Sequence, residues 1–180
     1  YPTALCGKFE EKFLSLPKEA IITPMREHQR YFPVVDEEGR LLNKFITVRN
    51  GGKEFLDVVA HGNERVLRAR LSDAEFFFNE DRKLKLEDRL EKLKTVSFQE
   101  GLGNMYDKSE RLAKLAEMVK FAINVKVDDT NLKRTALLSK TDLVAGMVVE
   151  FTELQGVMGR EYAKLDGEPA EVAEGIYEHY

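Results

Sequence analysis

The chain has 180 residues, of which 43% are hydrophobic and 33% charged, and its formal net charge is −4. This length suffices for one substantial core or for a small domain joined to a medium one, and the composition excludes an intrinsically disordered protein. The slightly acidic balance excludes a global attraction to nucleic acid, so any RNA contact needs a local basic face. No apolar run approaches the ~20 residues that a membrane-spanning helix needs, which predicts a protein without a membrane partner.

Cysteine usage and the chain ends add two expectations. The single cysteine, Cys6, excludes an internal disulfide framework and favours a reducing compartment, which predicts the cytoplasm. The chain starts at Tyr1 without a methionine and stops within a predicted helix that includes Ile176 and Tyr180. We therefore expect a piece of a longer protein.

The first fifty residues are predicted to mix helix and strand. Pro17 suits the first position of a short helix, which Pro24 then kinks or restarts. Aromatic and β-branched residues predict strands at 31–35 and 45–48, and the turn at 36–39 joins them into a hairpin. Because a lone hairpin is marginally stable, it must lie on other elements or belong to a sheet that this segment lacks.

From about residue 63 the hydrophobic period becomes that of a helix. Apolar residues recur along one stripe at positions 67, 71, 74 and 78, and leucines then predict a further helix over 86–93. Asp128 or Asp129 can cap a long helix whose register continues to Met147. The clearest stripe follows Gly103, and its members are predicted to face inward: Leu112, Leu115, Ala116, Val119 and Ile123.

These patterns predict an α+β fold that is predominantly helical. Residues 1–55 form a small mixed lobe with a β-hairpin, taken as part of a preceding, truncated domain. Residues 56–180 form a bundle of five or six helices, and residues 154–165 are predicted to be helical despite Gly156 and Gly159.

A helical bundle with His and Asp residues raises the alternative of an HD-type metal-dependent phosphohydrolase. Such a site needs several His and Asp ligands, including an adjacent His-Asp pair, to hold a metal and activate water. The chain has only His28, His61 and His179, and none precedes an aspartate. At the position that resembles an HD helix, Lys140 and a threonine precede Asp142, and a lysine repels a cation. We therefore predict no metal ligands and no catalytic residues.

Two clusters are candidates for contacting RNA. The first lies on one predicted helix, whose guanidinium groups match phosphate geometry: Arg65, Arg68 and Arg70. The competing interpretation is internal pairing at helical spacing, Glu64 with Arg68 and Arg70 with Asp73.

The second cluster combines cations with aromatic rings. Arg26, His28 and Arg30 lie beside Tyr31 and Phe32, and aromatic rings can stack on unpaired bases. Side chains of this kind on a strand are more often part of the core. A third hypothesis is a purely structural module that contacts other protein through residues 76–78 or Tyr162.

Four segments carry a family resemblance. They are residues 25–34 (MREHQRYFPV), 63–77 (NERVLRARLSDAEFF), 140–144 (KTDLV) and 149–163 (VEFTELQGVMGREYA). In this order the chain closely resembles an internal section of the β subunit of bacterial glycyl-tRNA synthetase, and residues 56–180 resemble its HD-like domain.

The resemblance implies a function for the larger assembly. It implies a cytoplasmic heterotetramer of two α and two β subunits that ligates glycine to tRNA(Gly). ATP and Mg would be used at the α subunit, and no cofactor would bind in this segment. The β subunit would support tRNA binding, and Lys140 departs from the HD metal pattern, which argues against hydrolase activity.

Overall fold

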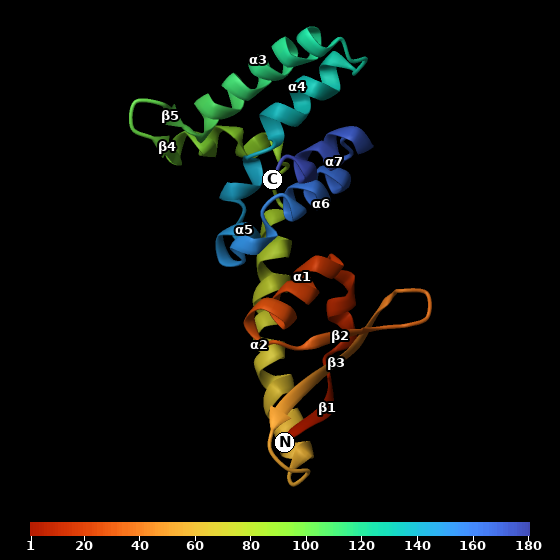
Figure 1. Cartoon of the computed structure of the whole chain (residues 1–180). Coiled ribbons are helices and arrows are strands. Elements are labelled where there is room, and N and C mark those ends of the chain that lie inside the picture. The colour runs from red at the N-terminus through yellow and green to blue at the C-terminus, as the bar shows by residue number, and fades with distance from the viewer. The chain divides into compact units, whose positions relative to one another are not determined.

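A computed structural model describes all of residues 1–180 (Figure 1). The fold is α+β and predominantly helical, as predicted. The chain divides into two compact units, Tyr1–Asn79 and Glu80–Tyr180. None of its helices is both long enough and apolar enough to cross a bilayer.

The first unit is built on a three-stranded antiparallel sheet. The order is β1 (Pro2–Lys8), β3 (Leu41–Asn50), β2 (Phe32–Val35), so the predicted hairpin is confirmed. The hairpin needs no strand from outside this segment, because β1 pairs with β3 along its whole length. Proline, alanine and glycine in β1 have low strand propensity, so the sequence did not predict this strand.

An aromatic stack forms the centre of this sheet's buried face. Phe45 is fully buried and stacks on Tyr31, with ring centroids 4.6 Å apart. A Cβ at Gly7 would collide with the Phe45 ring, so the neighbouring strand needs a glycine there. The hairpin turn contains Gly39 at φ +79°, a conformation that glycine adopts without strain.

Helical elements cover the sheet of the first unit. Leu67, Leu71 and Ala74 of the longest helix are completely buried. The backbone N of Lys8 donates to Glu64 (2.9 Å), and Lys12 pairs with Glu75 (2.7 Å). The elements are η1 (Glu11–Ser15), α1 (Lys18–Thr23), η2 (Pro24–His28) and α2 (Leu56–Asp81).

The contacts of α2 indicate to which of the two units this helix belongs. The predicted boundary at 55/56 lies where α2 begins, whereas the compact units separate at 79/80. Most of α2 therefore belongs with the sheet, because its acidic side chains Glu64 and Glu75 contact β1 and η1.

The second unit consists mainly of short helices. Its elements are η3 (Glu87–Thr95), β4 (Ser97–Gln99), β5 (Gly103–Asn104), α3 (Met105–Ile123), α4 (Asp129–Leu138), η4 (Thr141–Val144), α5 (Gly146–Glu150), η5 (Thr152–Leu154), α6 (Val157–Asp166) and α7 (Ala170–Glu178). The predicted helix over 86–93 is a 3₁₀ segment.

The long helix predicted from Asp128 to Met147 is only partly present. Asp128 is its N-cap, since the backbone N of Asn131 donates to Asp128 Oδ1 (2.8 Å). The helix ends at Leu138, so the prediction of a continuous register to Met147 is wrong. A side-chain hydroxyl group donates to a backbone carbonyl at this point, since Thr141 Oγ1 donates to Leu138 O at 2.7 Å. Such bonds offer the backbone an alternative to continued helix.

The predicted inward face of α3 is also wrong in part. Leu115, Val119 and Ile123 have exposed fractions of 53%, 54% and 66%. The buried residues of this helix are Met105, Ser109 and Ala113, because α3 packs on α4 and η3 through a different face. The sequence showed the amphipathic pattern but not which side the domain covers.

Candidate functional site

The predicted basic-aromatic cluster forms a corner of the first unit. The single turn η2 leads to Arg30, which adopts a left-handed conformation (φ +56°), and Tyr31 N donates to Met25 O at 2.8 Å. This is the geometry of a helix C-terminus, where a glycine is usual. The following residues turn into β2, so two arginines and two aromatic residues are brought to one edge.

The corner contains a small hollow of about 210 Å³. Tyr31 belongs to the core and is 6% exposed, whereas Phe32 is 59% exposed. Arg30 pairs with Glu27 at 3.6 Å, but 79% of its side chain faces solvent, so this pair contributes little. His28 is exposed at the end of η2 and does not line the hollow. The lining residues are Arg26, Glu27, Arg30, Tyr31, Phe32 and Pro33.

The three arginines of α2 do not share one face. Arg68 Nε pairs with Glu10 Oε1 at 2.7 Å, on the side of the helix that packs on the lobe. Arg65 and Arg70 line a shallow hollow of about 620 Å³ on another side, together with Asp73. The predicted Glu64–Arg68 pair is replaced, because Glu64 accepts from the backbone of Lys8 instead.

The segment that resembles an HD helix encloses a buried carboxylate. Asp142 is fully buried, its Oδ2 accepts from the backbone N of Gly156 (2.6 Å), and its Oδ1 has no hydrogen-bond partner. Burial raises the pKa of Asp142 to about 6, although the Gly156 and Gly159 backbone donors oppose this rise. Burial and the charge of Lys108 lower the pKa of Lys140 to about 8.

This donor set does not fit a metal ion. No group of three or more His, Cys, Asp or Glu side chains lies close enough together to hold one. Lys140 is placed beside the only buried carboxylate of the segment, and its ammonium group lies 3.8 Å from the ring centroid of Tyr180.

Two glycines explain much of the motif at 149–163. Gly156 has φ +77° and begins α6, and a Cβ there would lie 2.5 Å from the Tyr180 ring. A Cβ at Gly159 would lie 2.7 Å from Ile176 Cγ2 and 3.0 Å from Asp142 Oδ2. The two glycines therefore allow α6 to approach Asp142 closely.

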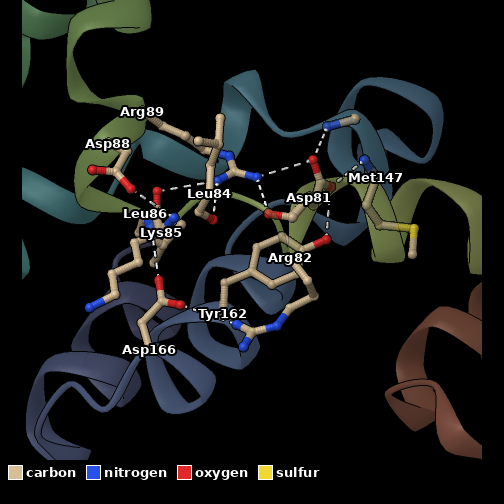
Figure 2. Close-up of polar contacts among 11 residues, drawn as sticks. Asp81, Arg82, Leu84, Lys85, Leu86, Asp88, Arg89, Met147, Tyr162 and Asp166 are labelled. Atoms are coloured by element: carbon tan, nitrogen blue, oxygen red, sulfur yellow. Dashed lines mark hydrogen bonds and ion pairs between the residues drawn. The ribbon is translucent and has the colours of Figure 1, made fainter.

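A buried polar cluster around Asp81 was not found from the sequence (Figure 2). Asp81 Oδ1 accepts from the backbone N of Gly146 (2.7 Å) and from Arg89 Nη2 (3.3 Å). Its Oδ2 accepts from the backbone N of Met147 (2.9 Å) and the hydroxyl of Tyr162 (2.8 Å). Asp81 and Arg89 are 6% and 3% exposed.

The Asp81 cluster is structural. Asp81 satisfies the first backbone donors of α5 from a distant helix, as an N-cap residue would. Arg89 also donates to the carbonyls of Leu84 (2.8 Å) and Asp81 (2.5 Å), so both buried charges are compensated. Burial and the adjacent Asp81 carboxylate raise the pKa of Tyr162, which is 2% exposed. The hypothesis that Tyr162 contacts another protein is therefore wrong.

Comparison with known proteins identifies the family. The family model described as glycyl-tRNA synthetase beta subunit matches residues 1–180. Glycine–tRNA ligase beta subunits from Syntrophotalea carbinolica, Desulforamulus reducens and Bacillus subtilis are 59%, 54% and 52% identical to all of this chain. The match covers 26%, 26% and 27% of those relatives, so the chain spans about a quarter of their length. The chain belongs to the glycyl-tRNA synthetase beta-subunit family.

Proposed function

We propose that this chain is a tRNA-positioning and scaffold segment of the β subunit of glycine–tRNA ligase. The observation that carries this proposal is the family match over every residue of the chain. In this proposal two β subunits assemble with two α subunits in the cytoplasm. The α subunit uses ATP and Mg to attach glycine to tRNA(Gly), and this segment has no catalytic residue.

The corner at η2 is the best candidate for an RNA contact. Phe32 offers an exposed ring, and Arg26 and Arg30 flank it at the same hollow. An aromatic face beside guanidinium groups suits an unpaired base with its phosphate, because stacking accepts any base and arginine pairs with phosphate. A local site of this kind is what a chain of net charge −4 requires.

The outer side of α2 supports a second, weaker contact. Arg65 is exposed and lines an open hollow, so it can reach a phosphate without breaking an internal pair. Arg68 already pairs with Glu10, so its guanidinium is a poorer candidate.

Aminoacylation by the complete α₂β₂ enzyme tests the corner. Phe32→Ala should raise the KM for tRNA(Gly) by roughly fivefold or more, since stacking on one base contributes about 1–3 kcal/mol. Arg30→Gly should also raise this KM. Glycine suits φ +56° at position 30, so the backbone of this variant is not strained. Glycine-dependent ATP–pyrophosphate exchange, which needs no tRNA, should not change.

Each variant has a matched control on the same hairpin. Val35→Ala removes a side chain that is 52% exposed from the same strand, and Arg40→Gly removes an arginine that pairs with Asp36 at the turn. Both controls should keep the original KM for tRNA. If the Phe32 and Arg30 variants behave like these controls, the corner does not contact tRNA.

A further inference from the structure

The three-stranded sheet of the first unit leaves one of its faces open to solvent. Leu5, Gly7 and Phe45 point to the inner face and are buried, so the residues that alternate with them along β1 and β3 point outward. These outward side chains are exposed, and we name them the outer sheet face: Cys6, Lys8, Phe32, Lys44, Ile46 and Val48.

The strand register places these side chains in two rows across the sheet. Ile46 lies directly between Cys6 of β1 and Phe32 of β2, and these three form an apolar row. Phe32 is 59% exposed and Ile46 39%. Lys8 and Lys44 are directly opposite one another two residues further along, about 7 Å from the apolar row. A cationic row therefore lies beside an apolar one.

The two lysines lie close together on a sheet that has no acidic residue. Phe9 N donates to Asn43 O (3.1 Å), so the next pair, Lys8 and Lys44, is one without backbone hydrogen bonds, in which side chains approach most closely. Like charges in this position repel. None of the three strands contains Asp or Glu, although acidic residues outnumber basic ones in the chain, 32 to 28. The charge of the outer sheet face therefore favours an anionic partner.

We propose that the outer sheet face binds an unpaired stretch of RNA. This inference rests on the proposed function, since tRNA(Gly) would supply that stretch. One phosphate lies between Lys8 and Lys44, where it removes their repulsion, and the attached base stacks on the Phe32 ring. A duplex does not suit this face, because its bases stack on one another and offer no free base face to the apolar row.

Alkylation of Cys6 tests this inference, because Cys6 is the only cysteine of residues 1–180 and belongs to the apolar row. The rate of its reaction with N-ethylmaleimide is measured on its own peptide, by mass spectrometry, in the proposed α₂β₂ assembly. A short single-stranded RNA and tRNA(Gly), each at saturation, should slow this reaction roughly tenfold, since bound bases cover the row. A blunt RNA duplex should not slow it.

Two results of the alkylation would overturn the inference. If the duplex protects Cys6 as well as the single strand does, the face recognises charge alone and not unpaired bases. If Cys6 does not react even without RNA, protein covers the outer sheet face.

The salt dependence of single-stranded RNA binding tests the lysine row. Lys44→Ala should reduce the slope of log K against log salt by about 0.7, the value for one phosphate of a single strand. The control is Lys18→Ala on α1, which removes a lysine side chain that is 71% exposed away from the sheet, and it should leave the slope unchanged. Equal slopes for the two variants would show that the lysine row holds no phosphate.

These measurements separate the outer sheet face from the proposed function. If Arg30→Gly raises the KM for tRNA(Gly) but neither RNA slows the alkylation of Cys6, the corner contacts tRNA and this inference is wrong. If the short RNA protects Cys6 and tRNA(Gly) does not, the face binds unpaired RNA and the proposed role in positioning tRNA is wrong.

Discussion

At the scale of single residues, Asp142 shows opposing influences on one carboxyl group. Two backbone donors, from Gly156 and Gly159, favour its ionised form, and the nearby charge of Lys140 does so as well. Removal from water favours the neutral form and is the larger influence, so the pKa rises from 3.8 to about 6. The neutral form would also give the unpartnered Oδ1 a proton to donate.

This raised pKa makes stability depend on pH in a defined window. Between pH 3.8 and about 6 the folded state binds more protons than the unfolded state, so stability falls as pH rises. At neutral pH the ionised Asp142 costs roughly 3 kcal/mol relative to pH below 4. Asp142→Asn should remove this fall and raise the free energy of unfolding at pH 7.

Urea unfolding of the chain at a series of pH values measures this effect. The control is Asp73→Asn on the exposed side of α2, whose curve of stability against pH should run parallel to that of the original chain. If the Asp142→Asn curve also runs parallel to the original between pH 4 and 6, the carboxyl does not titrate there and the assignment fails.

Asp81 is the residue on which the buried cluster of the second unit depends. Asp81→Ala leaves the Arg89 guanidinium without its carboxylate and leaves two backbone donors of α5 and the Tyr162 hydroxyl without an acceptor. Removing one partner of a buried charge pair costs about 3–5 kcal/mol. We expect Asp81→Ala to lower the free energy of unfolding by that amount in urea titrations.

A surface aspartate provides the comparison for Asp81. Asp88 is exposed and accepts a hydrogen bond from the backbone N of Lys85, at 3.1 Å. Asp88→Ala should therefore cost about 1 kcal/mol. Equal losses from the two variants would contradict the view that the Asp81 cluster holds the unit together.

At the scale of elements, replacing two helical glycines by alanine should change stability in opposite directions. Gly159→Ala should destabilise the chain by about 1–3 kcal/mol, because its Cβ would lie 2.7 Å from Ile176 Cγ2 in a packed core. Gly62 lies within α2, and a Cβ added there would meet no atom within 4 Å, so Gly62→Ala should stabilise by about 0.5–1 kcal/mol. Thermal unfolding of both variants measures the contrast. A loss of stability in Gly62→Ala would show that something covers that side of α2.

Local sequence patterns predicted the helices and strands better than they predicted the contacts that each element makes. The hairpin, the Asp128 cap and the buried stripe of α2 were visible because turn chemistry, capping and helical period act over a few residues. The strand β1 was missed because its pairing with β3 joins residues distant in the sequence, such as Pro2 and Asn50. The exposed side of α3 was mistaken for the core because a periodic stripe does not say which partner covers it.

The candidate site was predicted in composition but not in arrangement. The sequence grouped Arg26 and Arg30 with two aromatic residues, and the structure separates these into an exposed Phe32 and a buried Tyr31. Arg68 of α2 forms an ion pair with Glu10, whereas Arg65 and Arg70 line an open hollow. Glu64, which lies four positions before Arg68, accepts from the Lys8 backbone instead of pairing with Arg68. Such long-range partners leave no periodic trace in the sequence.

At the scale of the whole molecule, net charge decides how the proposed RNA binding should respond to salt. A chain with 28 basic and 32 acidic residues has no general attraction for phosphate, so each specific arginine contact should contribute visibly to the salt dependence. Arg65 and Arg68 lie one turn apart on α2, and of the two Arg68 forms the ion pair with Glu10. They form a matched pair for this test.

Titration of tRNA(Gly) against the proposed α₂β₂ assembly at several salt concentrations distinguishes these arginines. Arg65→Ala should weaken binding and reduce the slope of log K against log salt by about 1, because one phosphate contact and its counterion release are lost. Arg68→Ala should leave the slope unchanged, since its guanidinium already pairs with Glu10 at 2.7 Å. If Arg68→Ala reduces the slope and Arg65→Ala does not, the face of α2 that meets tRNA is the one packed beside η1, and the outer hollow has no part in binding.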